Sequence, residues 1–185
     1  MPRAGLTRSR VVDAAIELVD KHGLPALTLA AVAEHCGVAA PSLYKHVSNI
    51  ADLRTLVGIR VMEEMTDSFT ATVLGRSGTD AITSLMRAYR AYVTAHPARY
   101  AAVPIDPLHQ QEYAASGRRM LEIMQAALRP WQLDENELIH TIRAARVIVH
   151  GFASLEAAGG FGLPHDLDET YERLIRLFLA TLPPL

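Results

Sequence analysis

Apolar residues recur at spacings of three and four along nearly the whole chain, which is the period of an amphipathic α-helix. In residues 8–22, for example, Val11, Ala14, Ala15, Leu18 and Val19 form one apolar stripe. No segment alternates apolar and polar residues convincingly enough to indicate a strand. The pattern therefore predicts an all-α fold with about nine helices.

Residues that cap and break helices set the expected boundaries in the first third of the chain. Thr7 is expected to cap a first helix that Gly23 ends, and Thr28 a second helix that Gly37 ends. A third helix is expected to start near Pro41, and Ser48 or Asn49 is expected to cap a long fourth helix that runs to about Phe69. Further helices are expected over residues 80–94, 98–103, 108–128, 134–158 and 166–182.

A Gly- and Ser-rich stretch at residues 74–80 is the clearest linker. It divides the chain into a three-helix head over residues 1–50, a bridging fourth helix over residues 50–72, and a larger helical body over residues 73–185.

Composition narrows the function classes. The net charge is −2, which argues against a general nucleic-acid binder. Residues 1–60, however, carry seven Lys and Arg against five Asp and Glu, so the head is weakly basic. The single cysteine, Cys36, excludes an internal disulfide and a Cys-rich metal site. No apolar leader is visible, and the apolar segment 147–155 is too short to cross a membrane, so we expect a cytoplasmic, nucleoid-associated protein.

Residues 35–49, HCGVAAPSLYKHVSN, have the spacing of a helix-turn-helix unit. Ala33 is small enough for two helices to cross, and Gly37 tolerates the positive φ of the turn. The expected apolar anchors are Val32, Cys36, Val38, Leu43 and Val47. The residues left facing outward are Ala40, Pro41, Ser42, Tyr44, Lys45 and His46.

These outward residues suit a DNA surface. A helix N-terminus offers unpaired N–H groups to a phosphate, and Tyr44, Lys45 and His46 add donors and one positive charge. Ala40 and Ser42 are short enough to let the backbone approach base edges in the major groove. We therefore expect this element to dock into double-stranded DNA.

The stretch from Thr7 to Leu56 resembles the DNA-binding head of the TetR family of bacterial transcriptional regulators. The matching residues are T-R-x-R-V-V-x-A-A (7–15), H-G (22–23), L-T-L (27–29), V-A-x-x-C-G-V (32–38) and P-S-L-Y-K-H-V-S-N (41–49). The resemblance implies a ligand-responsive, sequence-specific repressor. Its implied DNA-facing residues are Thr28, Ala40, Pro41, Ser42, Tyr44, Lys45 and His46. We include Asn49 among the expected DNA-binding residues as well. Two departures from the family pattern are Ile50, where a basic residue is common, and Ala30-Ala31 at the start of the second helix.

The body resembles the branch of this family that is named for a W-H-G motif. The matching stretches are V-H-G-F-A-S-L-E-A-A-G (149–159), D-L-D (166–168) and Y-E-R-L-I (171–175), with Val149 in place of the tryptophan. This resemblance implies a ligand-binding and dimerisation domain.

The pattern of the helix at 134–158 predicts a homodimer independently. Apolar residues lie on nearly all its sides, and a body of five helices can bury such a helix only with a partner chain. We expect it to form a two-fold four-helix bundle with the last helix, through Ile148, Phe152, Leu155, Leu174 and Phe178. A dimer of this kind presents two recognition elements to an inverted-repeat operator, with half-sites about 34–36 Å apart.

Adaptable methionines and tyrosines with polar tips indicate a pocket in the body for a largely apolar small-molecule effector. The candidate residues are Met62, Met86, Tyr89, Tyr100, Met120, Met124, Trp131, His140, Arg143 and Val147. The alternative is that these side chains simply pack the core.

Competing chemistries lack the residues they need. The Ser42-x-x-Lys45 spacing has no S-D-N or K-T-G partner, the histidines lack metal-ligand spacing, and GGFG lacks the G-x-G-x-x-G pattern. We therefore expect no enzyme, no metal and no cofactor. The remaining alternative is an all-helical ligand-binding or adaptor protein that retains a helix-turn-helix without strong DNA binding.

Overall fold

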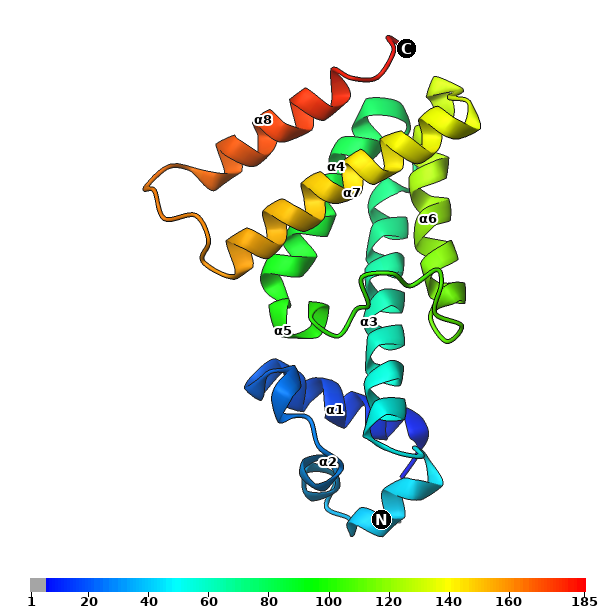
Figure 1. Ribbon diagram of the computed structural model, residues 1–185, viewed down its shortest axis with the longest axis vertical. Coiled ribbons are helices and arrows are strands. Elements are labelled where there is room, and N and C mark those ends of the chain that lie inside the picture. Colours follow the sequence, from blue (N-terminus) through cyan, green and yellow to red (C-terminus); the bar gives the residue numbers. More distant parts are fainter. Residues whose placement is uncertain (1–5) are drawn as a thin grey trace. The chain divides into compact units, whose positions relative to one another are not determined.

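The computed structural model, drawn in Figure 1, describes residues 6–185. Within this range it contains eight α-helices, three short 3-10 helices and no strand, so the all-α prediction is confirmed. The elements are α1 (Arg8–His22), η1 (Leu24–Ala26), α2 (Leu29–Cys36), η2 (Ala40–Lys45), α3 (Ile50–Val73), α4 (Gly78–Ala95), α5 (Pro97–Tyr100), α6 (Ala114–Leu128), η3 (Arg129–Trp131), α7 (Glu135–Ala157) and α8 (Leu167–Leu179). Residues 1–5, which the head and leader predictions include, lie outside the described residues.

The capping predictions for the first two helices are confirmed. The Thr7 hydroxyl accepts a hydrogen bond from the Arg10 N–H at 3.2 Å, which satisfies a donor that the first turn of α1 leaves open. The Thr28 hydroxyl does the same for α2, accepting from the Ala31 N–H at 3.1 Å. Gly37 ends α2 in the left-handed region.

Three predicted helices differ in form or extent. The third element, η2, is a 3-10 helix rather than an α-helix. The helix expected over 108–128 begins only at Ala114, and the one expected over 98–103 ends at Tyr100. Between these two helices, Pro104 and Pro107 restrict the backbone and lack the N–H donors that a continuing helix requires.

The chain forms two compact units. The first contains the residues up to Glu63 together with Ala98–Gly117, and the second contains Glu64–Pro97 with Arg118–Leu185. Residues 98–117, which the sequence analysis assigns to the body, are thus part of the unit that holds the head.

Each unit has its own apolar core. In the first unit, Val11, Ala15 and Val19 of α1 are fully buried. In the second unit, α4, α7 and α8 bury a core that includes Ile82, Met86, Ala145, Val149, Tyr171 and Ile175. Within residues 6–185, no helix combines the length and apolarity that a bilayer crossing requires.

Candidate nucleic-acid interface

The turn between α2 and η2 fixes the candidate DNA-binding element. Gly37 has φ +66°, a conformation that strains most other residues, and the Val38 N–H donates to the Ala33 carbonyl oxygen at 3.0 Å. Ala33 is buried beside this turn, as its predicted crossing role requires. On the other side, Leu43 and Val47 are buried and anchor η2 to the head.

With Leu43 facing inward, η2 presents the predicted surface to solvent. The Tyr44 side chain is 61% exposed, and Ala40, Pro41 and Lys45 are exposed as well. Ser42 and His46 are half-buried at the edge of this surface. Burial raises the pKa of the nearby Cys36 thiol, because a partly apolar environment disfavours the thiolate.

The start of α3 uses Asn49 and Ser48 as a cap. The Asn49 side-chain oxygen accepts from the Asp52 N–H at 2.9 Å, and the Ser48 N–H and hydroxyl each donate to Asp52 Oδ2 at 2.8 Å. These hydrogen bonds hold the pKa of Asp52 below its ordinary value, because they stabilise the carboxylate. Asn49 therefore orders the end of the loop between η2 and α3, and its side-chain N–H groups remain available to a ligand.

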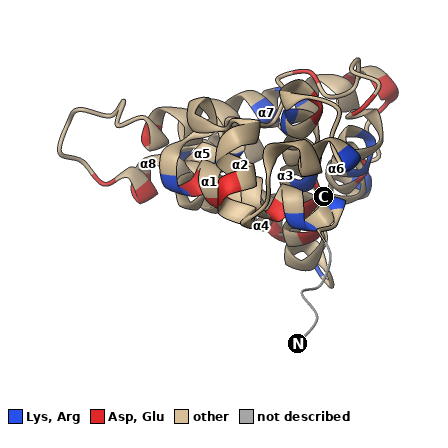
Figure 2. Cartoon of the chain, turned by 90° about the horizontal axis from the view of Figure 1, so that it is seen from below, with Lys and Arg blue, Asp and Glu red and all other residues tan. Residues whose placement is uncertain are grey.

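The structure adds Arg8 to the cations near this surface. The Arg8 side chain is 59% exposed, and its guanidinium lies 3.6 Å from the Asp52 carboxylate, next to the α3 cap. The sequence marks Arg8 only as part of the T-R pair at residues 7–8. The folded structure is needed to show that Arg8 lies beside the cap at residues 48–52. Figure 2 shows Lys and Arg interspersed with Asp and Glu along the helices. Within residues 38–48, Lys45 is the only charged side chain other than histidine.

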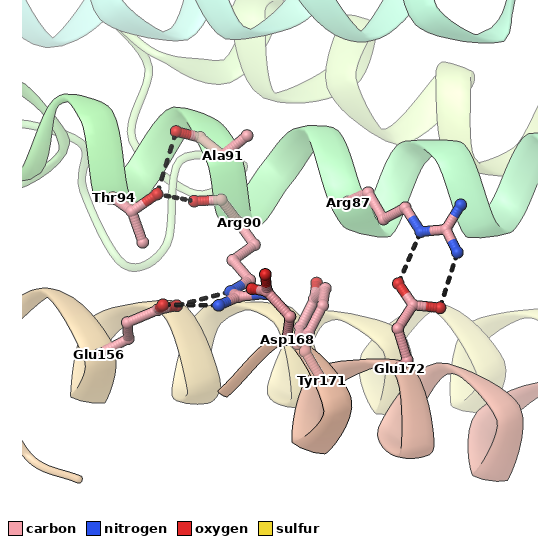
Figure 3. Close-up of a pocket in the computed structure, with 8 residues that line it drawn as sticks. All are labelled: Arg87, Arg90, Ala91, Thr94, Glu156, Asp168, Tyr171 and Glu172. Carbon is pink, nitrogen blue, oxygen red and sulfur yellow. Dashed lines mark hydrogen bonds and ion pairs between the residues drawn. The ribbon is translucent and has the colours of Figure 1, made fainter. Parts of the chain in front are cut away.

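A surface hollow of about 520 Å³ lies in the second unit (Figure 3). It is lined by Arg87, Arg90, Ala91, Thr94, Glu156, Asp168, Tyr171 and Glu172. Both guanidinium groups are engaged: Arg87 pairs with Glu172 at 2.7 Å, and Arg90 pairs with Glu156 at 2.6 Å. These pairs brace α4 against α7 and α8.

The predicted effector-pocket residues do not line this hollow, nor a second one of about 410 Å³ bordered by Glu122, Leu128 and Leu138. Met86 and Trp131 lie in the core of the second unit, with Tyr89 and Met124 packed against it. Met62 is buried in the first unit, and Tyr100 and Met120 are half-buried. His140, Arg143 and Val147 are exposed on α7, so they point away from that core.

The predicted interface residues separate into two groups. Phe152 and Phe178 are only 6% and 2% exposed and lie in the core of their own unit, so their apolar area is already used within one chain. Ile148 and Leu174 are half-buried, and Leu155 is 51% exposed. Exposed Val147 and Leu177 extend the outer apolar surface of α7 and α8 beyond the predicted set.

Comparison with known proteins identifies the family. Residues 82–178, more than half of the chain, match the family described as "Tetracyclin repressor-like, C-terminal domain", and residues 11–55 match "Bacterial regulatory proteins, tetR family". The chain belongs to the TetR family of transcriptional regulators. Family membership favours a DNA-binding regulator over the enzyme readings, because TetR-family regulators are not enzymes.

Two relatives match this TetR-family chain over most of their length. The uncharacterized HTH-type transcriptional regulator YobS of Bacillus subtilis (strain 168) is 30% identical over 98% of this chain and 95% of its own. The uncharacterized HTH-type transcriptional regulator Rv0681 of Mycobacterium tuberculosis is 34% identical over 84% of this chain and 72% of its own.

Solved structures share the TetR-family fold at low sequence identity. A protein of unknown function from Rhodococcus sp. RHA1 superposes with a TM-score of 0.83 at 20% identity, over 99% of this chain and 98% of its own. The Streptomyces coelicolor TetR family protein ActR, solved in complex with (S)-DNPA, gives a TM-score of 0.70 at 19% identity, over 97% of this chain and 98% of its own.

Proposed function

We propose that this TetR-family regulator is a cytoplasmic, nucleoid-associated repressor that binds an inverted-repeat operator as a homodimer and is released by a largely apolar small molecule. The observation that carries the proposal is the surface of η2. Exposed Tyr44 and Lys45 stand on a short helix whose tilt is fixed by the Gly37 turn and the buried Leu43 anchor.

The chemistry of this surface fits a phosphate backbone and a shallow contact with base edges. The Lys45 ammonium neutralises one phosphate, and the Tyr44 hydroxyl donates to another. Short Ala40 and Ser42 leave room for the backbone of η2 to enter the major groove. Arg8 supplies a second cation beside the α3 cap, which offsets the absence of a basic residue at Ile50.

Dimerisation is supported by the apolar outer surface of α7 and α8. Val147, Leu155 and Leu177 are 72%, 51% and 64% exposed, an unfavourable exposure that a second copy relieves. Pairing the two helices with their two-fold copies forms a four-helix bundle. The resulting dimer carries two η2 elements to half-sites about 34–36 Å apart.

For the effector site, we propose the apolar region bordered by Tyr89 and Met124, which pack against the core that contains Met86. Methionine repacks easily around a guest, and the tyrosine hydroxyl gives one polar anchor. The effector has to bind the non-DNA-binding state more tightly than the DNA-binding state, because a ligand with equal affinity for both shifts nothing. Alanine at Tyr89 or Met124 is expected to weaken the response to the effector.

Selection of bound sites from random duplex DNA, followed by titration at several salt concentrations, tests the proposal. We expect an inverted repeat and a steep loss of affinity with salt. The double variant Tyr44→Ala/Lys45→Ala is expected to lose affinity and to lower the salt slope by about two units, because the dimer loses two Lys45 ammonium groups that each neutralise one phosphate. Arg118→Ala removes one exposed cation from the second unit and is the matched control.

The adaptor alternative predicts the opposite result. The sparse charge of residues 38–48 favours it, since one lysine gives limited phosphate neutralisation. If the selection yields no preferred duplex and the affinity for DNA barely changes with salt, the result favours a ligand-binding or adaptor protein without strong DNA binding. Unchanged affinity of the folded Tyr44→Ala/Lys45→Ala variant for the selected duplex would remove η2 from the interface.

A further inference from the structure

The second hollow of the chain, with a volume of about 410 Å³, lies where α6 turns into α7 through η3 (Figure 1). All the residues that line it belong to the second unit. Neither the η2 surface nor the effector region at Tyr89 and Met124 uses any of them. The hollow is therefore a feature that DNA binding and the proposed effector leave unexplained.

The floor of this hollow is apolar. Leu128 is buried in the core of the second unit, and Leu133 and Leu138 are half-buried and pack against that core. Water gains nothing from such a floor, whereas an apolar group that covers it is removed from solvent. The floor therefore favours a ligand with an apolar middle.

One face of α6 and η3 forms a wall of the hollow. Glu122, Ala126 and Arg129 recur there at spacings of four and three, so they lie on the same side of the helix, with Gln125 beside them. Ala126 is the short residue among three long ones. The space above its methyl group therefore stays open between a carboxylate at one end and a guanidinium at the other.

The polar side chains around the hollow have no partner within the described residues 6–185. These exposed side chains are Glu122, Gln125, Arg129 and Gln132. In the first hollow, by contrast, both guanidinium groups are engaged by carboxylates of the protein. The second hollow thus presents one cation, one anion and two amides whose hydrogen-bonding groups are available to a ligand.

The turn that forms the opposite wall is held in place. Gln132 has φ +48° and is the one non-glycine residue within residues 6–185 whose φ is positive, a conformation that persists only where its surroundings fix it. The neighbouring Trp131 is buried, and its indole N–H donates to the Pro183 carbonyl oxygen at 2.9 Å. The Asp134 side chain caps α7 by accepting from the Glu137 N–H at 2.9 Å. The hollow is therefore preformed, which lowers the entropic cost of binding.

We propose that this hollow binds a short apolar peptide with free ends, a use that goes beyond the proposed function. The carboxylate of the peptide pairs with the Arg129 guanidinium, whose planar fork matches both carboxylate oxygens. The ammonium group pairs with the Glu122 carboxylate, and the apolar side chains cover the leucine floor. The amides of Gln125 and Gln132 donate to and accept from the peptide groups between the two ends.

The spacing of the two charges sets the length of the ligand. Glu122 and Arg129 are seven positions apart, which corresponds to about 10 Å along a helix axis. An extended peptide of three residues spans about 10 Å as well. A single amino acid is too short to reach both charges, so the site selects a peptide of about three residues.

The probe is trileucine, titrated into the full-length protein by calorimetry, together with its C-terminal amide and its N-acetyl derivative. We expect trileucine to bind with one site per chain. Amidation removes the charge that Arg129 pairs with, and acetylation removes the charge that Glu122 pairs with. Each cap should weaken binding by about tenfold, the effect of one charge-assisted hydrogen bond.

Two variants assign each end of the peptide to its residue. Arg129→Gln should bind trileucine about tenfold more weakly than the wild type and should no longer distinguish it from its amide. Glu122→Gln should likewise no longer distinguish trileucine from its N-acetyl derivative. A general loss of stability cannot produce this crossed pattern, because it would weaken all three peptides equally.

Two further variants test the location. Ala126→Phe fills the hollow from an exposed position and should abolish binding. Arg118→Gln removes an exposed cation of α6 outside the hollow and is the matched control, with affinities equal to those of the wild type.

The experiment contains no DNA, so its result leaves the proposed function standing in every case. Absence of trileucine binding at millimolar concentration would overturn the peptide site. Equal affinity of the wild type for the free and the capped peptides would overturn it too. Binding that survives in Ala126→Phe, or a penalty for amidation that survives in Arg129→Gln, would show that the peptide binds elsewhere.

Discussion

The Arg90 guanidinium of α4 donates to both carboxylate oxygens of Glu156 near the end of α7, at 2.6 Å each. The same guanidinium lies 2.8 Å from Asp168 at the start of α8 and about 5 Å from the ring centroids of Phe152 and Tyr171. One side chain therefore joins three helices of the second unit, as Figure 3 shows. The Arg90 side chain is only 15% exposed, so solvent screens these interactions weakly.

Replacing Arg90 by methionine keeps much of the side-chain volume and removes the charge. It leaves the carboxylate of Glu156, a side chain that is only 18% exposed, without its partner. We expect a loss of about 2–3 kcal/mol in the free energy of unfolding, the range for charge-assisted hydrogen bonds. Chemical denaturation measures it.

The matched control is Arg173→Met, because Arg173 forms an exposed ion pair with Glu169 within α8. Exposed helical pairs contribute about 0.3–0.5 kcal/mol, so this variant should unfold close to the wild type. Equal losses in the two variants would show that Arg90 is no more important than a surface ion pair.

The Asp52 cap predicts a pH dependence of the stability of the head. Hydrogen bonds from Ser48 lower the pKa of Asp52 in the folded protein, so its ionised form stabilises the fold. This contribution is complete above the ordinary aspartate pKa of about 3.9 and is lost as the pH falls from there through the lowered value. At neutral pH, Asp52→Asn should lose about 1 kcal/mol of stability, since an amide lacks the charge at the α3 N-terminus.

Unfolding curves of the wild type and Asp52→Asn at several pH values check this prediction. The difference between them should shrink as the pH falls below about 4, because protonated aspartic acid and asparagine are both neutral. A difference that stays constant from neutral to acidic pH would mean that the charge of Asp52 contributes nothing.

The caps and glycine turns of the head were predictable because each depends on its own few residues. Thr7, Thr28 and Gly37 act through hydrogen bonds and backbone angles that span at most five positions. The identity of η2 as a 3-10 helix was not predictable in the same way. Pro41 permits either helix type at its first turn, so the residues of η2 do not distinguish between them.

The positions of side chains in the body were less predictable, because tertiary packing decides them. Periodicity shows that Phe152 and Phe178 are apolar, but it cannot show whether they face their own core or a partner chain. The ion pair of Asp20 in α1 with Arg99 in α5 was also hidden, because the two residues are far apart in the sequence. The loop after α5 comes so close to Gly58 that an added Cβ would lie 2.6 Å from the Ala102 carbonyl oxygen. The sequence shows no sign of this contact, because Gly58 is a lone glycine inside a helical pattern.

Gly37 allows a test of backbone conformation separate from packing. A Cβ at Gly37 would meet no atom within 4 Å, so only its φ of +66° resists substitution. Gly37→Ala should therefore destabilise the protein by about 1–2 kcal/mol. Gly37→Asn should cost less, because asparagine tolerates the left-handed region. Thermal unfolding of the two variants and the wild type measures these differences. If both variants are as stable as the wild type, the φ angle at this turn is unimportant for stability.

The exposed surface of α7 and α8 gives a prediction about assembly. Val147 and Leu177 are 72% and 64% exposed, and a charge at each would be buried without a partner in the proposed four-helix bundle. We expect Val147→Glu/Leu177→Glu to be a folded monomer at micromolar concentration, as measured by light scattering, and to lose operator affinity because the two η2 elements are no longer linked. Leu74→Glu is the control, since Leu74 is 81% exposed in the loop between α3 and α4. A wild-type protein that is monomeric under the same conditions, or a double variant that stays dimeric, would place the interface elsewhere.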